Sequence, residues 1–320
     1  MSLTDDIARG PLPAWATIVE VGPRDGFQME AGFIPTATKI RIIDALSAAG
    51  VPVIEATSFV SAQVIPQLAD AADVLAGIER RAGTTYLAMV PNRRGADAAL
   101  AAGADALKFV VSATDAGNLK NVGKTVAASL NELSLVVDLA RTAGRPVHVV
   151  IGLAFGCPLT GDVPPAAIEH IVARVSAAGV TEVAVADSYG FAHPEQVARM
   201  MTRLKLGWPM VNFALHLHDT RGLGLANALA GLTVGVTRFE ASLGGMGGGP
   251  IIPGATGNIA TDDLVHLLQG MGVETGIDLD RLGDATRQVQ AHLGRALPSK
   301  VAASGTSAAL FARAHRGGPS

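Results

Sequence analysis

Short apolar runs and longer amphipathic segments alternate eight times along the chain. The short runs are rich in β-branched residues, as buried strands usually are. They predict strands over residues 16–21, 52–56, 85–90, 106–112, 146–153, 181–186, 212–217 and 238–243. The segments that follow them predict helices over 35–49, 64–80, 94–102, 124–143, 164–178, 194–206, 224–234 and 261–271. Many of these helices start near proline, serine or threonine and end at glycine, as helix caps require.

This alternation predicts parallel strands joined by right-handed crossovers. Eight such units close a (β/α)8 barrel, or TIM barrel, and about 250 residues are typical of that fold. In this chain of 320 residues we assign 16–276 to the barrel domain. Residues 277–320 are expected to form a C-terminal helix and a flexible tail on the same domain. An open doubly wound sheet is the less favoured alternative, because no G-x-G-x-x-G motif follows the first strand.

Composition limits the partners and the compartment. The chain has 25 basic and 28 acidic residues and a net charge of −3, so no basic excess is present to bind nucleic acid or an anionic membrane. The single cysteine, Cys157, has no partner for an internal disulfide, which fits a reducing compartment. No run of about 18 apolar residues suggests a membrane span, and the N-terminus lacks the features of a secretory leader. We therefore expect a cytoplasmic location.

A barrel carries its chemistry at the carboxyl ends of its strands. His216 and His218 are two residues apart in a predicted strand, so both side chains point to one face. Asp25 follows the first strand, which neighbours the last strand in a closed barrel, and Asn258 follows the last strand. Two imidazoles, a carboxylate and an amide oxygen suit a divalent metal such as Mg²⁺ or Mn²⁺. The alternative is a hydrogen-bonded histidine pair without a metal.

Two further charged residues belong to the same predicted mouth. Arg24 is a flat, permanent cation, which suits a developing enolate or carboxylate oxygen. It could also form a salt bridge with Glu55 or Asp187, and the two roles can coexist. Glu55 stands in the apolar run VIEAT, where a lone charge would be costly to bury. We therefore expect a cationic partner for Glu55, either Arg24 or the metal site.

A glycine-rich segment lies between the last strand and the last helix. It contains Gly247, Gly248 and Gly249, and its backbone freedom is typical of a lid that closes over a substrate. A phosphate cradle and an ordinary surface loop are the alternatives. For Cys157, which follows the fifth strand, a buried structural role is favoured over that of a nucleophile.

The motifs VGPRDGFQME, VIEATSF, HLHDT and LGGMGGGPIIPGATGNIATDDLVHLL together resemble the 3-hydroxy-3-methylglutaryl-CoA (HMG-CoA) lyases. The resemblance covers roughly residues 18–297 and includes the wider group of metal-dependent lyases named for a D-R-E triad on a TIM barrel. It implies a divalent-metal-dependent retro-Claisen cleavage of HMG-CoA to acetyl-CoA and acetoacetate, a step of leucine degradation. It also suggests a homodimer that takes an acyl-CoA substrate.

The resemblance also implies residue roles. The metal ligands would be Asp25, His216, His218 and Asn258. Arg24 would stabilise the enolate of acetyl-CoA, Glu55 would support Arg24 and the metal shell, and Asp187 would be a further active-site carboxylate. The substrate-binding set would include Arg24 and Gln28. Arg221 is added to this set for its charge and not from the resemblance, because a cation at the mouth could meet a CoA phosphate or a second carboxylate. The segment 118–124, with two lysines, is a candidate for the CoA phosphates or an ordinary solvated loop.

The chain departs from the family at one chemically important position. HMG-CoA lyases usually have a cysteine in a GGCP run, as the acid that protonates the carbanion, and Gly249 stands there in this chain. Arg221 also follows the HDT run where an aromatic residue is common. These changes favour, as alternatives, a lyase acting on citramalyl-CoA or a branched hydroxyglutaryl-CoA. An aldolase or Claisen-type condensing enzyme and a non-catalytic CoA-ester binder are the remaining alternatives.

Overall fold

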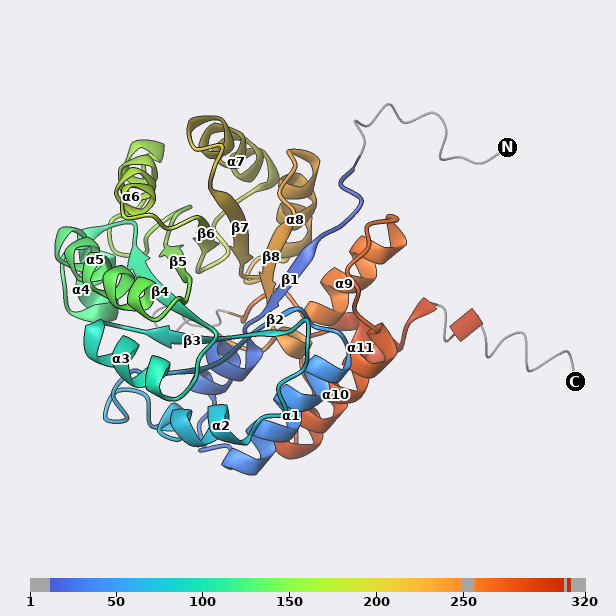
Figure 1. The fold of residues 1–320 in the computed structure, drawn as a ribbon. Helices are drawn as coiled ribbons and strands as arrows, with labels where there is room; N and C mark the ends of the chain where they lie inside the picture. The colour runs from blue at the N-terminus through green and yellow to red at the C-terminus, as the bar shows by residue number, and fades with distance from the viewer. Residues whose placement is uncertain (1–11, 249–255, 308–309, 312–320) are drawn as a thin grey trace, which may run out of the picture.

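Eight parallel strands close into a barrel, which confirms the predicted fold (Figure 1). The structure is a computed structural model and describes residues 12–248, 256–307 and 310–311. Each strand pairs with the next in the chain, and the last pairs with the first. The strands are β1 Thr17–Glu20, β2 Val53–Ser58, β3 Thr85–Val90, β4 Ala106–Ser112, β5 Val147–Gly152, β6 Glu182–Asp187, β7 Asn212–Leu217 and β8 Arg238–Ala241.

Helices surround the barrel on its outer side (Figure 1). They are α1 Thr36–Ala48, α2 Ala71–Gly77, α3 Arg93–Ala101, α4 Asp115–Val122, α5 Val126–Thr142, α6 Pro165–Ala177, α7 Pro194–Gly207, α8 Gly224–Thr233, α9 Thr261–Gly270, α10 Leu279–Leu293 and α11 Lys300–Ser304. Short turns are η1 Gly22–Gly26, η2 Phe27–Met29, η3 Pro66–Leu68 and η4 Leu243–Gly245. Among the described helices, none combines the length and apolar character needed to cross a bilayer.

Two predicted segments differ from the structure. The helix expected over 64–80 is shorter, because Pro66 opens the separate turn η3 and α2 begins only at Ala71. The segment expected as a loop over 118–124 is largely α4, whose N-terminus is capped by Thr114 and whose C-terminus ends at Gly123, at φ 70°. Its Lys124 pairs with Glu132 at 2.7 Å.

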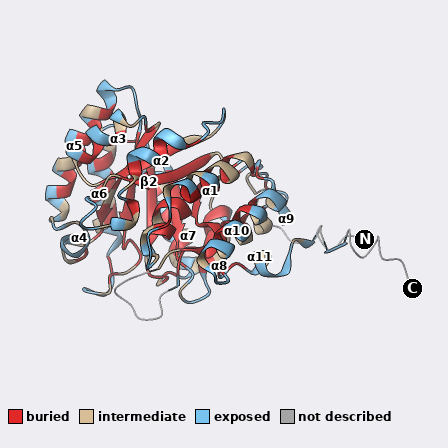
Figure 2. Cartoon of the chain, turned by 90° about the horizontal axis from the view of Figure 1, so that it is seen from below, coloured by how far each residue is buried: buried red, intermediate tan, exposed pale blue. Residues whose placement is uncertain are grey.

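The core continues from the barrel into the C-terminal helices. Buried residues fill the strands and the inner faces of the helices (Figure 2). Leu282 and Val289 of α10, together with Leu297, belong to the same apolar cluster as the barrel side chains. The division into residues 16–276 and 277–320 stays a prediction.

Candidate metal centre and active site

The turn η1 carries Arg24 and Asp25 directly from the end of β1 to the mouth of the barrel. Its sequence, GPRDG, forms one wide helical turn in which the backbone N–H of Asp25 donates to the carbonyl of Val21 at 2.7 Å. A Cβ at Gly22 would lie 2.7 Å from Oε1 of Glu20, so the turn requires glycine there.

Glu20 anchors this turn to the segment that follows β8. Its Oε1 accepts hydrogen bonds from the backbone N–H groups of Gly22 and Leu243, at 2.7 and 2.8 Å. Its Oε2 is bonded to the hydroxyl of Thr261 at 2.6 Å. Burial raises the pKa of Glu20 to about 7, in spite of these hydrogen bonds. A buried carboxyl group at the end of β1 is thus bonded to the turn that follows β8 and to the start of α9.

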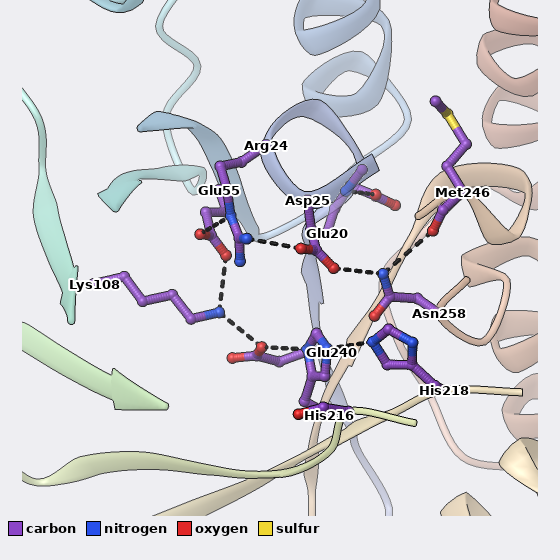
Figure 3. Close-up of polar contacts among 12 residues, drawn as sticks. Glu20, Arg24, Asp25, Glu55, Lys108, His216, His218, Glu240, Met246 and Asn258 are labelled. Atoms are coloured by element: carbon purple, nitrogen blue, oxygen red, sulfur yellow. Dashed lines mark hydrogen bonds and ion pairs between the residues drawn. The ribbon is translucent and has the colours of Figure 1, made fainter. Parts of the chain in front are cut away.

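Asp25, His216 and His218 gather at the mouth, with ligand atoms all within 4.8 Å of one another (Figure 3). The Nε2 atoms of His216 and His218 are 3.2 Å apart. Burial and, to a smaller extent, the neighbouring His216 lower the pKa of His218 to about 4. Burial also opposes the charge of Asp25, but Arg24 and both histidines hold its pKa at about 2. At neutral pH the site therefore presents a neutral imidazole and a carboxylate, the forms that bind metals.

Asn258 completes this donor set. Its Nδ2 donates to Oδ2 of Asp25 at 2.7 Å and to the carbonyl of Met246 at 3.2 Å. Its Oδ1 is buried and has no hydrogen-bond partner among the described residues. A buried acceptor without a donor is costly, and a cation beside it would satisfy it. The chemistry of the four predicted ligand residues thus fits a divalent metal, and the ligand atoms of Asp25, His216 and His218 lie close enough together to share one.

A continuous chain of ion pairs extends from this site into the barrel interior. Nε of Arg24 donates to Oε1 of Glu55, which confirms the expected cationic partner of Glu55. Oε2 of Glu55 accepts from Nζ of Lys108 at 2.8 Å, and the same Nζ donates to Oε2 of Glu240 at 2.7 Å. That carboxylate oxygen lies 2.9 Å from Nδ1 of His216 (Figure 3).

Lys108 and Glu240 are absent from the sequence-predicted site. Desolvation opposes both charges, but each holds the other ionised: the pKa of Lys108 is raised and that of Glu240 is lowered. Lys108 is the one charged residue of the run ALKFVVS, and Glu240 stands between the apolar Phe239 and Ala241 in the run RFEAS. The argument applied to Glu55, that a buried charge needs a partner, would have found both.

Asp187, the last residue of β6, and Arg221, in the segment between β7 and α8, both contact the loop that joins β6 to α7. The carboxylate of Asp187 is buried and accepts from the backbone N–H groups of Phe191 and Ala192, at 2.8 and 2.9 Å. Burial raises its pKa. Nη1 of Arg221 donates to the carbonyls of Tyr189 and Gly190, and its guanidinium stacks 4.7 Å from the ring centre of Phe191. Both residues order the β6–α7 loop, and their roles in catalysis and substrate binding stay predictions.

Of the remaining predicted residues, Gln28 and Gly247 lie beside Asp25 and Asn258. Nε2 of Gln28 donates to Oδ1 of Asp25 at 2.9 Å. Gly247 has φ 114°, and a Cβ there would lie 2.7 Å from Nδ2 of Asn258. Gly248 is described as well, whereas Gly249 lies outside the described residues. Cys157 is buried beside Thr114, whose hydroxyl lies 3.3 Å from its Sγ.

Three known proteins with sequences similar to this chain are HMG-CoA lyases. The rat mitochondrial HMG-CoA lyase is 41% identical over 293 residues, which are 92% of this chain and 90% of that protein. A Bacillus subtilis HMG-CoA lyase is 42% identical over 91% of this chain and 97% of its own. A cytoplasmic HMG-CoA lyase of Danio rerio is 40% identical over 91% of this chain and 87% of its own.

Two solved structures that this chain resembles are HMG-CoA lyases as well. The crystal structure of the Bacillus subtilis HMG-CoA lyase matches with a TM-score of 0.90 and 40% identity, covering 92% of this chain and 99% of that one. The Acinetobacter baumannii HMG-CoA lyase, solved with coenzyme A and 3-methylmalate, matches with a TM-score of 0.88 and 38% identity, covering 92% and 96%. The family model described as HMGL-like matches residues 16–289. This chain belongs to the HMGL-like family.

Proposed function

We propose that the protein is a carbon–carbon lyase that cleaves HMG-CoA to acetyl-CoA and acetoacetate. The observation that carries this proposal is the hydrogen bond from Arg24 to Asp25, which also lies within reach of His216 and His218. The chain that carries these residues is about 40% identical to named HMG-CoA lyases. The names of these relatives do not favour citramalyl-CoA, a branched hydroxyglutaryl-CoA or a condensing reaction. They also favour an enzyme over a non-catalytic binder.

A divalent cation, Mg²⁺ or Mn²⁺, would be held by Asp25, His216, His218 and Asn258, and its chemistry when bound is to orient the substrate and acidify the 3-hydroxyl. Asp25 is ionised throughout the neutral range and accepts the hydroxyl proton in this scheme. Because its pKa is low, Asp25 is a weak base that gives the proton up again readily. The C2–C3 bond then breaks, and its electron pair passes to the acetyl-CoA fragment as an enolate.

Arg24 is placed to stabilise that enolate. Its Nε and Nη1 are bonded to Glu55 and Asp25, and a guanidinium has five donors in total, so donors remain for the enolate oxygen. The enolate must then gain a proton to become acetyl-CoA. Since glycine stands at position 249, we assign this step to water at the mouth rather than to a loop thiol.

The direct test is acetyl-CoA release from HMG-CoA by the purified protein with Mg²⁺ or Mn²⁺. We expect release that stops on chelation and returns when metal is added back. His216→Ala should abolish it, while His170→Ala, on the exposed face of α6, should not. Faster cleavage of citramalyl-CoA would overturn the substrate assignment. No cleavage of either substrate by metal-loaded protein would overturn the activity. A cytoplasmic location, a homodimer and a place in leucine degradation remain further proposals.

A further inference from the structure

Lys108 has no part in the reaction scheme above, although it lies at the centre of the polar chain. It comes from β4, which contributes none of the predicted site residues, and only 1% of its surface is exposed. A lysine in the interior of a barrel is costly unless its charge is paired and its N–H groups are bonded. Here both conditions are met, by Glu55 at 2.8 Å and Glu240 at 2.7 Å.

The two carboxylates lead to different halves of the site. Glu55 is bonded through its other oxygen to Nε of Arg24. Glu240 uses the same oxygen for Lys108 and for Nδ1 of His216. A carboxylate beside Nδ1 requires the proton to be on that nitrogen, which leaves Nε2 as the acceptor that faces His218 and the metal position. Lys108 is therefore the link between the guanidinium and the imidazole.

Charge adds a second reason for the lysine. Three carboxylates, those of Asp25, Glu55 and Glu240, lie along this chain, and Arg24 and Lys108 are its permanent cations. Without Lys108, the carboxylate of Glu240 would keep only the imidazole of His216 as a partner among the contacts described. It would then be free to turn away from Nδ1 of His216.

We propose that Lys108 is a positioning residue that fixes Glu240 against His216 and Glu55 against Arg24. One buried lysine thus sets both the metal-binding tautomer of His216 and the orientation of the guanidinium. The part of this inference that concerns turnover rests on the proposed lyase reaction. The part that concerns His216 and the metal is independent of any reaction.

The test replaces Lys108 by methionine, which fills a similar volume without charge or N–H donors. In the metal-free protein, ¹⁵N–¹H spectra of the imidazoles should show His216 as one Nδ1–H tautomer in the wild type and as a mixture in Lys108→Met. The affinity for Mn²⁺, measured by calorimetry, should fall about 10-fold or more, as when other residues that orient metal ligands are removed. In the lyase assay, kcat should fall more than KM rises.

A double variant tests the route through Glu240. Glu240→Gln keeps an oxygen that can accept from Nδ1 of His216 but carries no charge that needs a lysine. If Lys108 acts through Glu240, the loss of Mn²⁺ affinity caused by Lys108→Met should be much smaller in the Glu240→Gln background. Equal losses in the two backgrounds would overturn that route.

Lys39 offers a matched control. It is also 1% exposed and ion-paired, with Asp70 at 2.6 Å, but it belongs to α1 outside the barrel. Lys39→Met should lower stability and leave the His216 tautomer and Mn²⁺ affinity unchanged. Should Lys108→Met fail to fold, Lys108→Gln keeps an N–H donor and should give an intermediate loss of affinity.

The proposal would be overturned if folded Lys108→Met bound Mn²⁺ as tightly as the wild type and showed His216 as a single Nδ1–H tautomer. An equal loss of affinity in Lys39→Met would overturn it as well, because the effect would then reflect general destabilisation. A wild-type protein that binds Mn²⁺ but releases no acetyl-CoA would contradict the proposed reaction instead, and the spectra and affinities would still decide the role of Lys108.

Discussion

Nη1 of Arg24 donates to Oδ1 of Asp25 at 2.7 Å, although the two residues are consecutive in the chain. The turn η1 places both side chains on the same side, and Glu55 from β2 holds Nε of the same guanidinium. The guanidinium of Arg24 and the carboxylate of Asp25 therefore hold each other in place. A movement of either side chain would displace the other.

The first prediction concerns the shape of this cation. Arg24→Lys keeps the charge, but an ammonium group cannot reproduce the planar fork that bridges Glu55 and Asp25. We expect kcat to fall by about 10²–10³, the usual loss when a donor to a developing anion is removed. Steady-state kinetics on HMG-CoA measure this, with Arg94→Lys on the exposed start of α3 as the control. An unchanged kcat in Arg24→Lys would contradict the role given to the guanidinium.

The second prediction concerns Glu20 and pH. Its pKa is about 7 in the folded protein against 4.5 for an ordinary glutamate, because burial disfavours the charge. Below the lower value the carboxyl is protonated in both states, so its contribution to stability is fully present. As pH rises towards 7 the unfolded chain loses this proton first, so the free energy of unfolding falls, by about 3 kcal/mol in total.

Glu20→Gln imitates the protonated carboxyl, with an oxygen for Gly22 and Leu243 and an amide donor for Thr261. Between pH 4.5 and 7 its unfolding free energy, measured by urea titration, should decline less than that of the wild type. At pH 8 the variant should be the more stable protein. Parallel pH profiles for the two proteins would show that Glu20 is not held protonated by burial.

The third prediction concerns the β6–α7 loop. In Asp187→Asn, one side-chain oxygen becomes an N–H group that faces the backbone N–H of Phe191 or Ala192. We expect the free energy of unfolding to fall by about 1–3 kcal/mol, the usual cost of a buried donor without an acceptor. The exposed Asp162→Asn serves as the comparison in the same denaturation experiment. Equal stabilities would mean that the loop does not depend on this carboxylate.

The fourth prediction concerns position 249. Gly249→Cys would restore the thiol that HMG-CoA lyases usually have in this run, and a general acid contributes about 10²–10⁴ in rate when it is well placed. We expect kcat on HMG-CoA to rise in this variant and to fall again after thiol alkylation. Gly249→Ser, with a poorer acid of similar size, should show little gain. No rise in kcat with cysteine would mean that protonation of the enolate does not limit turnover.

The barrel and the cluster at its mouth could be predicted because both depend on local periodicity. Alternation along β7 puts His216 and His218 on one face, and closure of the barrel brings Asp25 beside them. For Glu55, the sequence predicts a cationic partner, either Arg24 or the metal site, and does not reveal its second partner, Lys108. Lys108 comes from a strand on the far side of the barrel interior, and a charged residue in an apolar run does not reveal which strand it will face.

Local hydrogen bonds underlie the two segments where the predicted and the observed helices differ. The carboxylate of Asp70 bonds with Thr36 and Lys39 of α1, so it gives no side-chain cap to α2, which spans Ala71–Gly77. The short α4 depends on a Thr114 cap and on Gly123, signals that a reading by apolar periodicity overlooks. Both cases depend on the hydrogen bonds of one side chain, that of Asp70 to α1 and that of Thr114 to the backbone of α4.

The bond between Glu20 and the backbone N–H of Leu243 joins residues more than 200 positions apart, and β1 finds β8 across a similar separation. During synthesis on the ribosome, one edge of β1 therefore has no neighbour until β8 has left the exit tunnel. Contacts of such high sequence separation form late and slowly. Until then the unpaired edge of β1 can pair with strands of other chains. We therefore expect the protein to need chaperones during its synthesis, although the folded barrel has no such open edge.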